Sequence, residues 1–162
     1  MQRLVPTLAL AVLLAACGPQ KDAGSTVTEG ETTVVASPDG SVSVSSPAGD
    51  VNVSEGSAVV AGEPPAFVPA YPGGAVVTTI AANEKGQRGG VYAFTTSDAP
   101  DKVFEFYRAR AEAAGLSSQT NVEAGGSRIY GAQGPAGDVA ITAAPQGPGQ
   151  TYVQVTWSTR AD

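Results

Sequence analysis

All ten aromatic residues of this 162-residue chain follow position 66. The 50 residues from 17 to 66 contain 24 Gly, Pro, Ser or Thr residues and no Leu, Ile or Met. A segment so poor in large apolar side chains buries too little surface to offset the entropy of ordering its backbone. The sequence therefore predicts a domain over residues 67–162 that follows a disordered N-terminal tether over residues 17–66.

The predicted tether is acidic, since seven carboxylates accompany Lys21 alone. Charges of one sign keep a linker extended, and a flexible coil of this length would span roughly 40 Å on average. Residues 37–45 and 46–54 form a tandem repeat, S-P-x-G-x-V-x-V-S. We expect a low-complexity spacer, because two copies are too few for a solenoid and an isolated hairpin is marginal in water. The alternative is a β-ribbon that pairs with the edge of a partner's sheet.

The N-terminus has the features of an export signal. Arg3 precedes an apolar run over residues 4–16, which is too short to span a bilayer but suits a signal-peptide core. The run ends Leu-Ala-Ala-Cys at Cys17, and this resembles the lipobox of bacterial lipoproteins. The resemblance implies that residues 1–16 are removed and that Cys17 is thioether-linked to diacylglycerol and acylated on its amine. An ordinary secretory peptide cleaved near Ala16 is the alternative, although it would leave an odd free thiol.

One helix is predicted after position 98. Asp98 is the expected N-cap and Gly115 the expected C-cap, and Val103, Tyr107 and Ala111 share an apolar stripe between them. Alternating or β-rich segments separated by turn residues predict strands over residues 75–81, 90–96, 116–122, 127–132, 139–143 and 151–158. Short connections require antiparallel neighbours. We therefore expect an α+β fold in the order β-β-α-β-β-β-β, a two-layer sandwich with one helix on an antiparallel sheet of about five or six strands.

Three short motifs carry a second resemblance. They are Tyr-Pro-Gly at residues 71–73, Phe-Tyr-Arg at residues 106–108, and the glycine that follows the helix, Gly115. Together they resemble small uncharacterised bacterial lipoprotein domains, and they are similar to the helix-grip domains of lipoprotein subunits in outer-membrane assembly machinery. The resemblance covers residues 67–162 and implies a fold, not an activity.

The composition excludes several chemistries. A chain with no His and one Cys has no Ser-His-Asp triad, no Cys–His pair and no His/Cys zinc site. Asp98 and Asp101 are explained by their places at the helix start, so they do not form a catalytic carboxylate pair. A net charge of −6 lacks the basic footprint of a nucleic-acid binder. We expect no catalytic residue, no cofactor, no metal site and no nucleic-acid partner.

Four residues of the domain are candidates for contact with a ligand or partner. Arg110 falls at the edge of the apolar helical stripe, where its head either lies in water or contacts an anion. Tyr71, Tyr130 and Tyr152 either line a binding surface or belong to the core. Neither choice is settled by the sequence.

These observations predict a bacterial envelope lipoprotein held at the membrane through Cys17. Gly18 is not the Asp that commonly signals inner-membrane retention, so the resemblance implies the outer membrane, facing the periplasm. We expect a non-catalytic protein-interaction or accessory assembly domain with an envelope protein as partner. The alternative is a periplasmic binding module for a small molecule or glycan, and an enzyme would need a carboxylate pair that we do not recognise.

Overall fold

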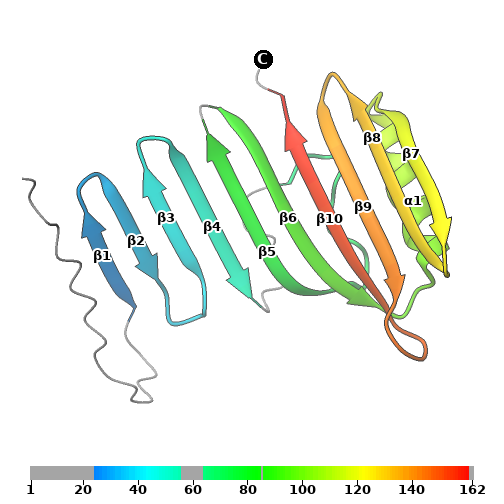
Figure 1. Cartoon of the computed structure of the whole chain (residues 1–162), viewed down its shortest axis with the longest axis horizontal. Coiled ribbons are helices and arrows are strands. Elements are labelled where there is room, and N and C mark those ends of the chain that lie inside the picture. The colour runs from blue at the N-terminus through cyan, green and yellow to red at the C-terminus, as the bar shows by residue number, and fades with distance from the viewer. Residues whose placement is uncertain (1–23, 56–63, 85, 161–162) are drawn as a thin grey trace, which may run out of the picture.

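The computed structural model describes residues 24–55, 64–84 and 86–160; the predicted signal peptide and Cys17 lie outside these ranges. In chain order its elements are β1 (Ser25–Glu29), β2 (Thr32–Ala36), β3 (Val42–Ser46), β4 (Gly49–Glu55), β5 (Ala75–Glu84), β6 (Gln87–Thr96), α1 (Pro100–Ala113), β7 (Ser117–Ala124), β8 (Ser127–Gly134), β9 (Gly137–Pro145) and β10 (Thr151–Thr159). The ten strands form one antiparallel sheet in the order β1-β2-β3-β4-β5-β6-β10-β9-β8-β7 (Figure 1). Helix α1 packs against β8 and β9 and touches β7, so it covers only one end of one sheet face.

The predicted two-layer α+β sandwich with five or six strands and a disordered tether is wrong. The fold is β-rich, with ten strands in a single sheet, and β1–β4 come from the segment predicted to be a tether. The prediction treated that segment as an isolated hairpin, whereas β4 pairs directly with β5. Each added strand satisfies the backbone hydrogen bonds of the strand before it, so the segment does not need a core of its own.

The tandem repeat forms the hairpin β3–β4. Its two Val-x-Val stretches lie opposite each other, with Val42 paired to Val53 and Val44 to Val51. On the other side of the hairpin, the hydroxyl of Ser43 donates a hydrogen bond to Oδ1 of Asn52 at 2.7 Å. The ribbon that the sequence left as an alternative is therefore formed, and it pairs with this chain's own sheet.

Helix α1 lies where the apolar stripe predicts it, although its first turn differs from the prediction. The N-cap is Ala99, with no side-chain capping bond, and Asp98 precedes it. At the other end Gly115 adopts a φ of +75°, which a glycine reaches at little cost. The amide of Leu116 then donates to the carbonyl of Ala111 at 2.9 Å and closes the helix.

The core lies between α1, residues 64–74 and one face of the sheet. In β10 the predicted alternation is confirmed, because Val153, Val155 and Trp157 are buried while Gln154 and Thr156 are exposed. The aromatic members of the core are Phe67, Tyr71, Tyr92, Phe94, Phe104, Tyr107, Tyr130 and Trp157. These large side chains fill the space between the helix and the sheet.

Candidate functional site

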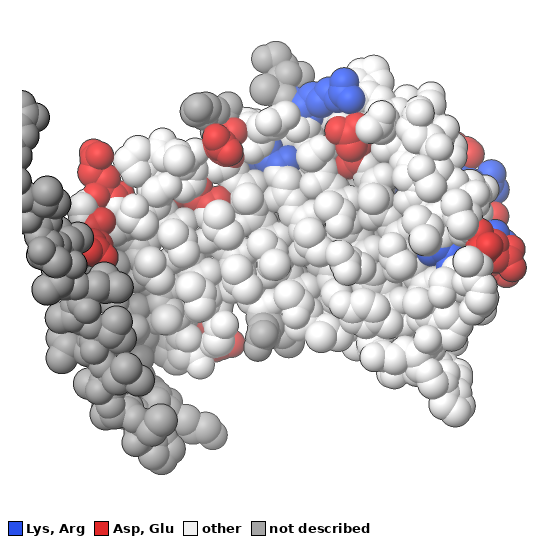
Figure 2. Space-filling view, viewed as in Figure 1, with Lys and Arg blue, Asp and Glu red and all other residues white. Residues whose placement is uncertain are grey.

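The sheet face opposite α1 is broad and nearly uncharged. Helix α1 lies behind the sheet in Figure 1, so that view looks onto the opposite face, which we call the open face. Figure 2 shows the same view, in which Lys, Arg, Asp and Glu gather around the rim and uncharged residues fill the centre. Where the uncharged residues of such a face are also apolar and contiguous, the face is a candidate contact site.

Strand register explains why this face is apolar. Paired residues lie on the same face of a sheet, and two rows of paired residues cross β1–β6. The large apolar members of the open face are Val27, Val34, Val42, Val44, Val51, Val53, Ile80 and Val91. Val27 is 61% exposed, Val51 37% and Ile80 38%, so no described residue covers them. Sequence reasoning missed this surface, although the Val-x-Val alternation of the repeat was the signal for it.

A hollow of about 260 Å³ lies at the far end of the open face, over β7–β10. Gly131 and Ala140 have little or no side chain, and polar residues that include Thr120, Gln133 and Asp138 surround them. Side-chain amide, hydroxyl and carboxylate groups of this kind suit hydrogen bonding rather than apolar contact. The open face therefore changes from an apolar surface over β1–β6 to a polar hollow over β7–β10.

A second hollow, of about 210 Å³, lies on the helix side of the sheet at the junction of β4 and β5. Asp50 and Asn52 come from the repeat hairpin, while Asn83, Arg88 and Trp157 come from β5, β6 and β10. Trp157 is 4% exposed and packs over Gly90, where an added Cβ would lie 2.9 Å from its ring. The hollow thus combines an indole wall with amide and charged groups.

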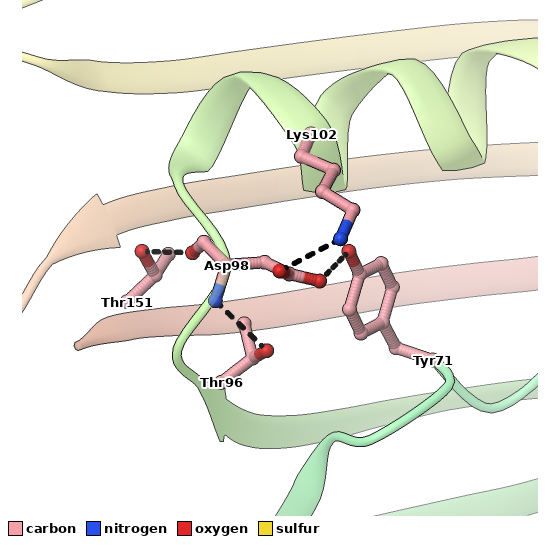
Figure 3. Close-up of polar contacts among 5 residues, drawn as sticks. All are labelled: Tyr71, Thr96, Asp98, Lys102 and Thr151. Carbon is pink, nitrogen blue, oxygen red and sulfur yellow. Dashed lines mark hydrogen bonds and ion pairs between the residues drawn. The ribbon is translucent and has the colours of Figure 1, made fainter. Parts of the chain in front are cut away.

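The most connected polar cluster is centred on Asp98 (Figure 3). Its carboxylate accepts hydrogen bonds from Nζ of Lys102 and from the hydroxyl of Tyr71, both at 2.8 Å. Its backbone amide donates to the hydroxyl of Thr96 at 3.2 Å, and its carbonyl accepts from Thr151 at 2.7 Å. Each contact comes from a different part of the chain, so the cluster holds the start of α1 against β6 and β10.

This cluster shifts two pKa values in opposite directions. Burial, followed by the hydrogen bond to Asp98, raises the pKa of Tyr71 to about 12. The hydrogen bond from Lys102, followed by that from Tyr71, lowers the pKa of the Asp98 carboxyl below its ordinary 3.8. At neutral pH Tyr71 is therefore a neutral donor and Asp98 a charged acceptor, an arrangement that stabilises structure without activating either group.

The four sequence candidates are not brought together into one site. Tyr71 and Tyr130 are buried in the core, whereas Tyr152 is half-buried on the open face. Arg110 is exposed, and its guanidinium lies 4.4 Å from the centre of the Phe106 ring. It also lines a hollow of about 280 Å³ with Phe67 and the end of α1.

Two buried tyrosines form a further hydrogen-bonded group beneath α1. The hydroxyl of Tyr107 donates to that of Tyr92, and the hydroxyl of Tyr92 donates to the carbonyl of Pro69 at 3.0 Å. The Tyr107 oxygen also lies 3.3 Å from the same carbonyl oxygen. Burial raises the pKa of both tyrosines. This group fixes residues 64–74 onto the core.

Two further properties concern only the part of the chain that the structure describes. Across residues 24–55, 64–84 and 86–160, no group of three or more Asp, Glu, Cys or His side chains could hold a metal ion. Within the same ranges, no helix is both long and apolar enough to cross a membrane.

Comparison with known proteins gives one family match. Residues 76–151 match a family model described as START domain-like. The match covers less than half of the chain and runs from β5 to the start of β10, so the strands β1–β4 lie outside it. No curated protein and no solved structure matches the chain.

Proposed function

We propose that this protein is a bacterial envelope lipoprotein, anchored through acylated Cys17, whose sheet is a non-catalytic module for contact with another envelope protein. The observation that carries the proposal is the uncharged open face, which continues without interruption from the repeat hairpin into the START-like part of the sheet. We place the protein at the outer membrane, facing the periplasm, because Gly18 follows the acylated cysteine. Nucleic acid is not among the proposed partners.

The open face suits a protein better than a lipid surface. Short β-branched side chains on a pleated sheet pack well against another protein surface. Residues 24–55 contain five carboxylates and no Lys or Arg, so this part of the sheet is repelled by anionic headgroups. The same residues contain no aromatic side chain that would sit in a membrane interface. A protein partner with an apolar face is therefore the best match.

The anchor is tested by fractionation. Cys17→Ala should move the protein out of the membrane fraction, whereas the wild type should remain there until detergent is added. Mass spectrometry of the wild-type N-terminal peptide should show a diacylglyceryl cysteine. An unmodified Cys17, or membrane association that the substitution leaves unchanged, would contradict the anchor.

The interaction surface is tested by placing a photo-reactive amino acid at two neighbouring positions of β3. Val44 points to the open face, and Ser45 points to the opposite face at similar distance from the hairpin turn. In intact envelopes, the probe at position 44 should give the same adduct in repeated experiments, and the probe at position 45 should not. Equal adducts from both positions, or none from position 44, would refute the open face as the contact surface.

A second candidate function is binding of a small molecule or glycan. The START domain-like match suggests a ligand-binding module, and the hollow beside Trp157 is the place where polar groups and an aromatic wall meet. Trp157 is the only tryptophan, and it lines this hollow and the one over β7–β10, whereas Asn83 lines this hollow and not the other. A saturable change during titration with oligosaccharides, abolished in Asn83→Ala, would support this function. An unchanged signal with every oligosaccharide tested would count against it.

A further inference from the structure

The outermost strand β1 has a free edge whose only charged residue is Glu29, at the end of the strand. All five residues from Ser25 to Glu29 are exposed, and within the described chain β1 pairs only with β2. Natural edge strands are usually guarded by Pro, Lys or a β-bulge, because an unpaired edge is a template for another strand. The sequence Ser-Thr-Val-Thr-Glu has no Pro or Lys, and the pairing of β1 with β2 has no bulge.

The opposite edge of the sheet is built differently. Strand β7 carries a register shift between Ser118 and Thr120, which is the irregularity expected of a guarded edge. Its Glu123 is paired with Arg128 of β8, and Arg128 also bridges to Asp101 of α1. The sheet can therefore grow at β1 but not readily at β7.

We infer that β1 pairs with β1 of a second copy of this chain, antiparallel and centred on Val27, so that the two sheets become one. In this register Val27 lies opposite the partner's Val27, and Thr26 lies opposite the partner's Thr28. Ser25 lies opposite the partner's Glu29, so a hydroxyl donor meets a carboxylate and no like charges face each other. The strand is thus complementary to itself under a two-fold axis, as an isologous dimer requires.

The pairing also completes the apolar row of the open face. Val27 is the most exposed large apolar residue described, at 61%, because a strand neighbours it on one side only. A second copy places the partner's Val27 beside it and extends the row through Val34, Val44 and Val51 of both chains. This inference does not depend on the lipid anchor, since it uses only the described strands.

Cysteine crosslinking tests the register directly in membranes that contain the full-length chain, with copper phenanthroline as oxidant. Opposite Cα atoms in antiparallel strands lie about 4.5–5.5 Å apart, which a disulfide can bridge. Val27→Cys should therefore give a disulfide-linked dimer that dithiothreitol reverses. Ser25→Cys should not link to itself, because this register separates the two Ser25 positions by roughly 13 Å along the strands. Chains with Ser25→Cys should instead link to chains with Glu29→Cys when both are present.

The controls separate this inference from the proposed function. Equal crosslinking of Val27→Cys and Ser25→Cys would show random collision and would overturn the pairing. The pairing would also be overturned if Val27→Cys gave no dimer while the amount of protein in the membrane matched that of the wild type. Val27→Lys should abolish the dimer seen by amine crosslinking of the detergent-solubilised chain, while Val35→Lys, on the opposite face of β2, should leave it intact. A disulfide dimer of the wild type would instead reveal a free Cys17 thiol, which contradicts the anchor but not the β1 pairing.

Discussion

Removing a buried hydroxyl from the core should stabilise this protein. Tyr130 is 1% exposed, and its hydroxyl has no hydrogen-bond partner among the described residues. Leaving such a group buried and unbonded costs about 1–3 kcal/mol. Tyr130→Phe deletes only that oxygen and keeps the edge-to-face contact with Phe104, whose ring centre lies 5.4 Å away. We therefore expect the free energy of unfolding to rise by about 1 kcal/mol.

Tyr92→Phe provides the matched control. Tyr92 is equally buried and loses the same atom, but its hydroxyl bonds Tyr107 and donates to the carbonyl of Pro69. Removing it should lower the free energy of unfolding by about 1 kcal/mol. Thermal unfolding of the two full-length variants in detergent, followed by circular dichroism, should shift Tm by about 3–5 °C in opposite directions. A Tyr130→Phe variant as destabilised as Tyr92→Phe would refute the reasoning, because it would mean that the Tyr130 hydroxyl is bonded.

Three other predictions concern single contacts. Gly90→Ala should lower the free energy of unfolding by about 1–3 kcal/mol and shift the fluorescence of Trp157, because the new methyl group would lie 2.9 Å from the indole. Thermal melts measure the first effect and emission spectra the second. Gly115→Ala should cost about 1 kcal/mol, since Gly115 has a φ of +75°, and a urea titration measures the loss. Lys102 lowers the pKa of the Asp98 carboxyl. The carboxylate therefore stabilises the fold above pH 3.8, and this contribution is lost as the pH falls through the lowered pKa of Asp98. The difference in Tm between the wild type and Asp98→Asn should shrink in acid.

The strands and helix after residue 74 were predictable because each carries a local signal. The alternation of β10 and the stripe of α1 come from side chains that a core must bury, so sequence and structure agree there. The strands β1–β4 were missed because their stability is not local. None of their described side chains is fully buried, and they are ordered through backbone pairing that begins at β5. The amino-acid composition of a segment indicates how much apolar surface it can bury. It does not indicate whether the edge of a neighbouring strand is available for pairing.

The candidate site illustrates the same limit. Tyr71 and Tyr130 were chosen by residue type, yet both lie in the core, because ten aromatic side chains in one domain are mostly needed for packing. The open-face valines were passed over because valines in a Ser-rich repeat resemble a spacer. Strand register, which only the structure gives, turns them into one surface.

The ordered repeat also changes where the sheet lies relative to the proposed anchor. Only seven residues separate Cys17 from Ser25, the first residue of β1, so a lipid on Cys17 holds that edge within about 28 Å of the attachment point even in a fully extended chain. The predicted 50-residue tether would have let the domain move far from the bilayer. A short connection instead keeps the β1 edges of neighbouring copies at similar height above the membrane. Confinement of this kind raises the effective concentration of one edge near another, so it increases the fraction of paired β1 strands at the membrane surface above the fraction in detergent.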